Sequence, residues 1–408
     1  MNTTTTSDNG RFSREILAGY DPEKMQGATI LLVGAGALAQ SLLPNLVLPG
    51  IGEIRLCDFD FFEPHNRGRS IYFPTDDEAS TLGLMKAKVV AHKVRTQMLA
   101  ENPIMHYALV PIQQLGFGAF TGVDVVVSAV DNPRARAYLS DVCRYLGITL
   151  IEGGFDGPAI AMSCFPGVSA EAATDEPCYR CSNPHLAGTF SCQRYAAEAA
   201  KKGIIAAIQP ASATLGGMMA EAAIQAVHGE TPTGFKRTTL NVRTGDHRQY
   251  RLTRALKCPG IHARLADEPI QLQLGAGDPL SALIAAVQSH LGAGAEIDLG
   301  EPLIVEAYCM SCGDVVTVES PEWAYDMRPR CRAKPCGGAW VSKGRPVEGH
   351  TPLKPIRLDA RTDQRILDLT CAKAGFTSMN LVHAFQPTTG EGAVLRMSGG
   401  LADLFDEV

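Results

Sequence analysis

The sequence predicts an α/β protein: a doubly wound, mostly parallel sheet followed by a second, smaller α+β domain. The first observation is a continuous apolar run of strand length at 28–33, followed by a glycine turn and a helical pattern that reaches about residue 48. The second is that strands and helices keep alternating to about residue 152, as in a parallel sheet covered on both faces. The third is a change of composition near residue 266.

The later elements of the first domain follow in order along the chain. They are a strand over 53–57, a helix over 82–99, strands near 105–110 and 123–129, a helix at about 133–146 and a strand at 148–152. An antiparallel set then follows at 159–165, 238–243 and 248–252, with a helix of small residues at about 212–228. We therefore expect a first domain over 1–265, with a loop-rich crossover at about 182–208.

The second domain is expected over 266–408. It combines helices at about 279–291 and 361–374 with short strands and Gly/Pro turns at about 303–345. Leu401, Leu404 and Phe405, in the C-terminal tail, either form a short docking element or pack on the domain.

Length, charge and cysteine content exclude several classes of protein. The chain has 408 residues, enough for two or three domains, each with its own core. With Lys+Arg 37 against Asp+Glu 43, the net charge of −6 speaks against nucleic acid and anionic membranes as partners. No segment has the length of a membrane span or the pattern of a signal peptide, so we expect a soluble cytoplasmic protein. Twelve cysteines are too few for a disulfide scaffold but include several close pairs.

The glycine turn predicts a nucleotide site in a Rossmann-like domain. In the order Gly34-x-Gly36-x-x-Ala39, the backbone can approach a phosphate at the N-terminus of a helix. Asp58 follows Gly36 by 22 residues, at the end of the next strand, where a carboxylate can hold ribose hydroxyls. These features fit a nicotinamide dehydrogenase and an ATP-dependent enzyme equally well.

The following polar residues favour ATP. They are Asn66, Arg69, Lys86 and Asp131, with Arg14 near the N-terminus. Several cations and an extra carboxylate around a glycine turn suit a triphosphate and Mg²⁺ better than a hydride donor. Lys88 is an alternative to Lys86, and Asp131-Asn132 alone also fits a helix N-cap.

This ordered set resembles the adenylating enzymes that include ubiquitin-like-protein activators and the sulfur-carrier adenylyltransferases of thiamin and molybdopterin biosynthesis. The resemblance covers roughly residues 10–262. It implies that the glycine turn binds ATP, that Asp58 holds the ribose and that Asp131 holds Mg²⁺. It also implies phosphate contacts from Asn66, Arg69 and Lys86, and a second-subunit role for Arg14, which requires a homodimer. The chain departs from the family pattern at Ala39, which replaces a glycine, and at Ser70, where Gln is common.

Cys178 and Cys181 have the two-residue gap that lets both thiolates bind one tetrahedral zinc ion. A redox pair is the competing interpretation, but the Pro177 and Ser182-Asn-Pro184 context is unlike a pair at a helix N-terminus. The family resemblance places the completing ligands after the last core strands, where this chain has Cys258 and His262.

A second zinc site is predicted from two knuckle-like turns, Cys309 with Cys312 and Cys331 with Cys336. This spacing is that of a zinc ribbon. The alternative joins the pair at 178 and 181 to the pair at 309 and 312, and leaves 331 and 336 unused. Both sites are expected to be structural.

Cys192 lies in the polar crossover, where the resemblance places an acceptor or catalytic cysteine. A thiolate there can attack an acyl-adenylate, release AMP and hold the carrier as a thioester. The favoured function is thus ATP-dependent activation of a small ubiquitin-like protein with a C-terminal glycine, in a bacterial conjugation pathway with a conjugating-enzyme-like acceptor. The alternatives are a sulfur-carrier adenylyltransferase and a silent partner of an active homologue.

Overall fold

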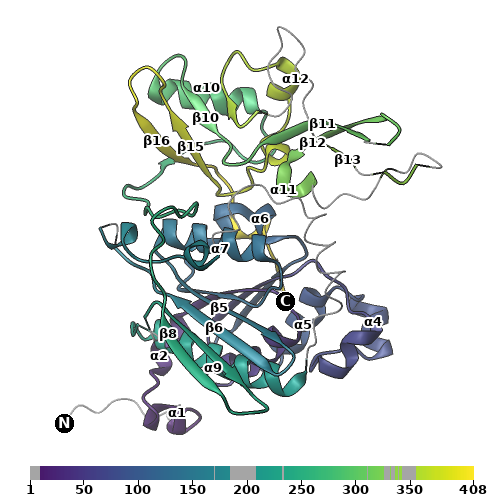
Figure 1. The fold of residues 1–408 in the computed structure, drawn as a ribbon, viewed down its shortest axis with the longest axis vertical. Coiled ribbons are helices and arrows are strands. Elements are labelled where there is room, and N and C mark those ends of the chain that lie inside the picture. The colour runs from purple at the N-terminus through teal and green to yellow at the C-terminus, as the bar shows by residue number, and fades with distance from the viewer. Residues whose placement is uncertain are drawn as a thin grey trace.

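The computed structural model describes residues 10–169, 171–183, 208–231, 234–309, 311–325, 331, 336–338, 340–341 and 355–408. Its largest unit is a nine-stranded sheet in the order β17-β3-β2-β1-β4-β5-β6-β7-β8 (Figure 1). The structure confirms the predicted α/β class with a doubly wound sheet. The division of the chain at about residue 265 stays a prediction.

Five parallel strands form the centre of this sheet. They are β1 (Thr29–Val33), β2 (Glu53–Cys57), β3 (Ile104–Ala108), β4 (Val125–Ser128) and β5 (Thr149–Asp156). Strand β1 pairs with β2 on one side and with β4 on the other, and all five of its residues are buried. A strand buried on both faces explains why its sequence is a continuous apolar run rather than an alternating one. The order of strands reverses at β1, so the carboxyl ends of β1 and β4 form a switch point.

The antiparallel extension comes next. It consists of β6 (Ala159–Phe165), β7 (Lys236–Asn241) and β8 (His247–Arg251), joined to the parallel strands through β5. Every residue of the edge strand β8 is exposed. The three strands match the predicted antiparallel set within a few residues.

Helices cover both faces of the sheet. One apolar cluster includes residues of α3 (Ala37–Val47), α5 (Lys86–Arg95) and α9 (Gln209–Val227). The other includes α6 (Ile112–Leu115), the 3₁₀ turn at Gly116–Phe120, and α7 (Pro133–Leu146). The smaller elements of this region are α1 (Ser13–Leu17), α2 (Pro22–Gly27), α4 (Asp76–Leu82) and 3₁₀ turns at Pro64–Arg69, Ala172–Thr174 and Tyr179–Ser182.

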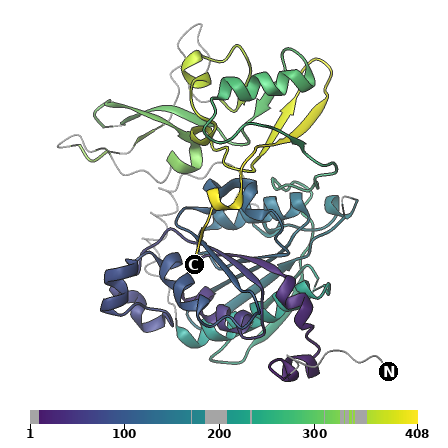
Figure 2. The same cartoon turned by 180° about the vertical axis from the view of Figure 1, so that it is seen from behind.

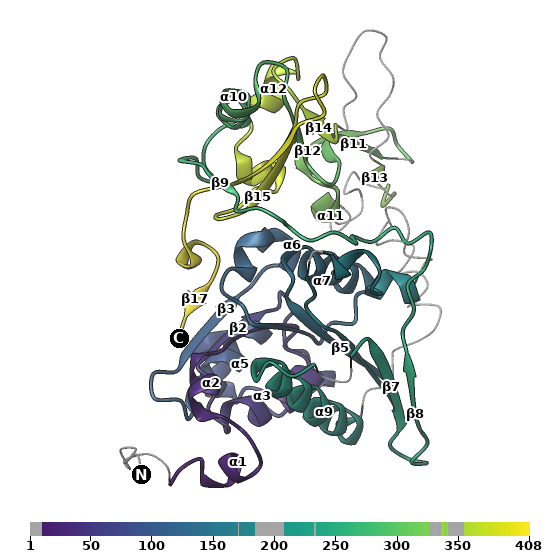
Figure 3. The same cartoon turned by 90° about the vertical axis from the view of Figure 1, so that its left-hand side faces the viewer.

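The second region lies above α6 and α7 in Figures 1 and 3. Its five-stranded sheet has the order β14-β10-β15-β16-β9, and a three-stranded sheet has the order β12-β11-β13. The strands of the first are β9 (Ile270–Gln271), β10 (Glu296–Asp298), β14 (Arg357–Leu358), β15 (Leu381–Phe385) and β16 (Gly392–Arg396). Those of the second are β11 (Leu303–Cys309), β12 (Val315–Pro321) and β13 (Trp340–Val341). The helices are α10 (Leu280–Leu291), α11 (Glu322–Tyr325) and α12 (Gln364–Leu367), with 3₁₀ turns at Cys371–Ala374 and Leu401–Asp403.

Two predicted helices are broken in the structure. The stretch 82–99 holds only α5, because Gly83, at a positive φ of 79°, ends α4 and a short connection follows before Lys86. The stretch 361–374 divides into α12 and the 3₁₀ turn that ends at Gly375, whose φ is 94°. The positive φ of Gly83 explains the end of α4, whereas Gly375 ends only the 3₁₀ turn and lies beyond the break between Leu367 and Cys371.

The C-terminal tail returns to the first sheet, as Figures 2 and 3 show. Strand β17 (Asp406–Glu407) pairs antiparallel with β3, the outermost of the parallel strands, and Phe405 is 4% exposed in the apolar cluster that includes α6 and α7. The tail therefore packs within the protein, but against the first sheet and its α6–α7 face rather than on the second domain, where the prediction placed it. Two further contacts join the regions: Thr377 Oγ1 donates to Leu115 O at 2.9 Å, and Phe117 N donates to Asn380 Oδ1 at 3.0 Å.

Within the described part of the chain, every helix is too short or too polar to cross a lipid bilayer.

Replacing Phe405 with Ala tests the role of the tail. Emptying this buried position is expected to lower the free energy of unfolding by about 3–5 kcal/mol, measured as the shift of a urea unfolding midpoint. Leu256→Ala is the control, because Leu256 is fully exposed. Equal midpoints for both variants would show that the tail is not part of the core.

Candidate nucleotide site and metal centres

A cavity of about 990 Å³ lies at the carboxyl ends of the parallel strands. Seven residues predicted from the sequence line it together: Gly34, Gly36, Asp58, Asn66, Arg69, Lys86 and Asp131. They come from the ends of β1, β2 and β4 and from the segments that follow, so the topology brings them to one edge of the sheet. Lys88 is not among the lining residues, which favours Lys86 over the alternative.

The turn between β1 and α3 forms the floor of the cavity. Gly34 has a φ of 101°, and a Cβ there would lie 2.7 Å from the carbonyl oxygen of Ala129, so only glycine fits. Gly36 is the N-cap of α3, provides no side chain to the cap, and has open space where a Cβ would be. The first amide groups of α3 therefore remain for an anion, with the positive end of the helix dipole behind them. Ala39 is fully buried, in keeping with close packing of this helix.

Asp58 is held in position by the backbone. Its Oδ2 accepts a hydrogen bond from Ala35 N at 2.6 Å, and its Oδ1 accepts one from Asp60 N at 2.7 Å. Burial raises the pKa of the Asp58 carboxyl, and these two hydrogen bonds oppose that shift. Each carboxylate oxygen can accept a second hydrogen bond, which is what a pair of ribose hydroxyls needs.

The cations stand on the segment after β2 and at the start of α5. Lys86 Nζ lies 3.0 Å from Asp60 Oδ2; the Lys86 side chain is 14% exposed and that of Asp60 is 58% exposed. Asn66 is buried, and its Oδ1 accepts a hydrogen bond from Glu63 N that fixes the turn leading to Arg69. The Asp60 carboxylate thus holds the Lys86 ammonium, and the turn fixed by Asn66 carries Arg69 to the same cavity.

The end of β4 shows how Asp131 and Asn132 divide their roles. Asn132 is the N-cap of α7, and its Oδ1 accepts a hydrogen bond from Arg134 N at 2.9 Å. Asp131 is exposed and lines the cavity. A solvent-exposed carboxylate beside a phosphate site is a typical ligand of Mg²⁺.

Arg136 is a cavity residue that the sequence did not reveal. Its Nε donates to Val130 O at 2.9 Å and its Nη2 to Gly153 O at 2.9 Å, and it pairs with the carboxylate of Glu152, which is 2% exposed. The guanidinium thereby joins the loop after β4 to the middle of β5. No spacing signal marks this arginine, because its partners are mostly backbone oxygens.

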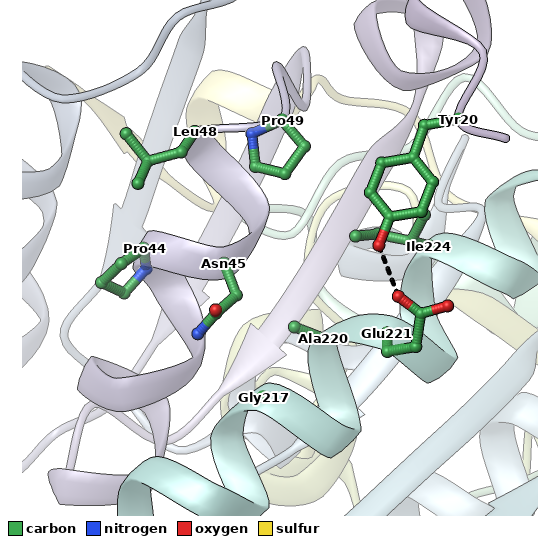
Figure 4. A pocket seen from close by; sticks show the side chains of 9 residues that line it. All are labelled: Tyr20, Pro44, Asn45, Leu48, Pro49, Gly217, Ala220, Glu221 and Ile224. Carbon is green, nitrogen blue, oxygen red and sulfur yellow. Dashed lines mark hydrogen bonds between the residues drawn. The ribbon is translucent and has the colours of Figure 1, made fainter. Parts of the chain in front are cut away.

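Arg14 does not line this cavity; its helix, α1, packs by the amino ends of β2 and β3, whereas the cavity lies at the carboxyl ends of the strands. It is exposed on α1, whereas Phe12, just before it, is buried with its ring against Gly50, in the turn that precedes β2. Figure 4 shows Tyr20, after α1, hydrogen-bonded to Glu221 of α9, beside a smaller cavity of about 220 Å³ between α3 and α9. Arg14 therefore does not line the nucleotide cavity of its own chain. Cys192 lies outside the described residues.

The first metal centre brings together Cys178, Cys181, Cys258 and His262. From Cys178 Sγ, the Sγ atoms of Cys181 and Cys258 lie at 3.9 and 3.6 Å, and His262 Nε2 lies at 3.3 Å. A tetrahedral zinc ion with bonds of about 2.3 Å to sulfur requires ligand atoms roughly 3.5–3.8 Å apart. Burial, with the nearby Arg254 and Arg144, lowers the pKa of His262 to about 4, so the imidazole is neutral and able to bind a metal.

Asp141 on α7 holds both halves of this centre. Its Oδ2 accepts from Arg180 Nε at 2.9 Å, and its Oδ1 accepts from Ile261 N at 3.0 Å. A Cβ at Gly260 would lie 2.8 Å from Cys178 Sγ, so a glycine lets the second segment approach the sulfur.

The second metal centre groups Cys309, Cys312, Cys331 and Cys336. Cys309 Sγ lies 3.3 Å from Cys336 Sγ, and Cys312 Sγ lies 3.9 Å from Cys331 Sγ. Backbone amides of Ser311 and Gly338 point at the sulfurs of Cys309 and Cys336, at 3.4 and 3.3 Å. Both groups can hold zinc, and the alternative that joined residues 178 and 181 to residues 309 and 312 is wrong.

Comparison with known proteins identifies the family. The ThiF family model matches residues 13–259, more than half of the chain. The chain belongs to the ThiF family. The predicted resemblance to this group of enzymes is therefore confirmed.

Three curated relatives match parts of the chain of different lengths. The sulfur carrier protein adenylyltransferase of Thermus thermophilus is 28% identical, covering 66% of this chain and 95% of that protein. The SAMP-activating enzyme E1 of Haloferax volcanii is 32% identical, over 43% of this chain and 62% of that protein. The SUMO-activating enzyme subunit 2 of Dictyostelium discoideum is 32% identical, over 33% of this chain and only 20% of that protein. Among solved structures, E. coli MccB with MccA-N7isoASN has a TM-score of 0.49 and 19% identity, over 63% of this chain and 75% of that one.

Metal analysis tests the two centres. The purified chain is expected to contain two zinc ions, because each centre supplies four ligands that suit a closed tetrahedral site. Cys178→Ala and Cys312→Ala should each lose one ion, while Cys371→Ala, a buried cysteine outside both groups, should keep two. One ion per unmodified chain would contradict the two-centre arrangement.

Proposed function

We propose that this ThiF-family chain is an ATP-dependent adenylyltransferase that activates the C-terminal carboxylate of a small ubiquitin-like protein. The observation that carries the proposal is the convergence of seven predicted residues on one cavity, with the uncapped N-terminus of α3 at its floor. A dehydrogenase needs the glycine turn and Asp58 but has no use for the added cluster of Arg69, Lys86 and Asp131.

The residues divide the work by position. Asp58 would hold the ribose, while the amides of α3, Asn66, Arg69 and Lys86 would hold the phosphates. The carrier carboxylate attacks the α-phosphorus in line, the bond from that phosphorus to the bridging oxygen breaks, and pyrophosphate leaves with an acyl-adenylate remaining. Mg²⁺ on Asp131 would neutralise part of the charge on the phosphates.

Arg14 would complete the site of a second copy of the chain. Its helix α1 lies by the amino ends of the strands, where the contacts of Phe12 and Tyr20 fix it, so Arg14 does not reach its own cavity. This supports the homodimer that the resemblance implies, with each arginine reaching the partner's phosphates.

The step after adenylation separates two functions. We favour transfer of the carrier to Cys192: its thiolate attacks the acyl-adenylate carbonyl, a thioester forms and AMP leaves. The carrier would then pass to a conjugating-enzyme-like acceptor in a bacterial pathway. A sulfur-carrier adenylyltransferase is the second candidate, favoured by the near-complete coverage of the Thermus thermophilus protein of that name.

Replacing Asp131 with Ala tests the adenylation site. ATP–pyrophosphate exchange in the presence of the carrier is expected to fall at least about 100-fold, because Mg²⁺ loses a ligand and the charge that develops on the phosphates is then less well neutralised. Asp267→Ala, an exposed carboxylate outside the cavity, should exchange normally. Normal exchange in Asp131→Ala would refute the assignment, and no exchange in the unmodified chain would support a silent partner instead.

Replacing Cys192 with Ala tests the thioester. The variant is expected to form the acyl-adenylate of the carrier but not the thiol-reducible conjugate, because only the sulfur nucleophile is lost. The assay is non-reducing electrophoresis of chain, carrier and ATP, with Cys371→Ala as the matched cysteine control. A reducible conjugate that persists in Cys192→Ala would contradict this role, because another cysteine would then hold the carrier; adenylation with no reducible conjugate in the unmodified chain would favour the sulfur-carrier function instead.

A further inference from the structure

Trp323 is the part of the second region that reaches the nucleotide cavity. Among the described residues that line this cavity, every other one lies between Val33 and Phe155. Trp323 stands on the short helix α11, which lies beside α6 and α7 in both Figures 1 and 3. A residue more than 160 positions further along the chain thus forms one wall of the cavity.

The helix that carries Trp323 packs against the β11–β12 hairpin. Helix α11 follows β12 directly, and Glu322 N donates to Pro302 O at 3.0 Å. At the base of the hairpin, Pro321 is buried and pairs with Leu303. Two residues before Pro321, Glu319 Oε2 lies 2.7 Å from Lys373 Nζ, an ion pair that joins β12 to the 3₁₀ turn at Cys371–Ala374. The position of Trp323 is therefore set by the β11–β12 hairpin that α11 follows.

The cavity beside α6 and α7 is apolar at its inner wall. Ile112, at the start of α6, is 2% exposed, and Ala135, in the first turn of α7, is 8% exposed. Neither is a phosphate ligand, and both belong to the face of the sheet that the second region covers. The Trp323 side chain is half-buried, which leaves part of its indole surface able to contact a ligand.

The part of ATP that the predicted site residues leave unplaced indicates what the wall formed by Trp323 can bind. In the proposed function, the phosphates occupy the α3 N-terminus and the ribose occupies Asp58, so the purine is the part of ATP that remains to be placed. A purine is a flat ring system that stacks well on an aromatic side chain and fits an apolar slot. We propose that Trp323 stacks on the adenine ring of ATP, so that the second region completes the nucleotide site. This inference rests on the proposed function.

Tryptophan fluorescence and binding measurements test the stacking. The sequence holds two tryptophans, Trp323 and Trp340, so Trp340→Phe leaves Trp323 as the reporter. Titration of that variant with ATP is expected to quench its emission, whereas inorganic tripolyphosphate, which has no base, should leave the emission unchanged. By calorimetry, Trp323→Ala should raise the Kd for ATP about 5- to 100-fold and leave the Kd for tripolyphosphate unchanged. Trp323→Phe should retain most of the ATP affinity.

The outcomes separate this inference from the proposed function. If Trp323→Ala binds ATP as tightly as the unmodified chain and ATP does not change the Trp323 emission, the stacking is wrong while adenylation stands. If Trp323→Ala raises only the KM for the carrier, the indole covers the carrier tail and the stacking is again wrong. If the unmodified chain neither binds ATP nor exchanges pyrophosphate, the proposed function itself fails.

Discussion

The close approach of two chain segments at Gly34 is the constraint on which the nucleotide cavity depends. The turn after β1 passes so near the carbonyl of Ala129, at the end of β4, that a side chain has no room there. This contact puts the N-terminus of α3 next to the loop that carries Asp131. Because β1 is the switch point of the sheet, helices diverge to both faces from this place and leave the amides uncovered.

Around this fixed floor, the remaining groups are held by short-range contacts. Backbone amides hold Asp58, a turn cap holds Asn66, and Arg136 clamps the loop after β4 to β5. Such preorganisation suits a reaction whose catalysis is positioning and charge stabilisation. The two metal centres lie outside the cavity. The first joins the Cys178–Cys181 turn to the segment at 258–262, and Asp141 of α7 hydrogen-bonds to both of these segments. The second lies at the turn of the β11–β12 hairpin.

The sequence predicts the fold and most of the cavity for a physical reason. Buried parallel strands give continuous apolar runs, and residues at their carboxyl ends meet at one edge whatever their separation in the chain, as Asp58 and Asp131 do. Cysteine spacing likewise predicts the group at 309–336 and the pair at 178 and 181, whereas the completing ligands Cys258 and His262 follow from the family resemblance. Arg136, Trp323 and the pairing of β17 with β3 escape such patterns, because each depends on how distant segments pack. The ends of α4 at Gly83 and of the 3₁₀ turn at Gly375 also depend on local φ angles.

A crystal structure with ATP and Mg²⁺ tests the central claim most directly. The account predicts the triphosphate over the first amides of α3, ribose hydroxyls on the Asp58 carboxylate and the metal ion on Asp131. A nucleotide bound elsewhere, or a diphosphate-linked nicotinamide dinucleotide displacing it from this cavity in solution, would contradict the account.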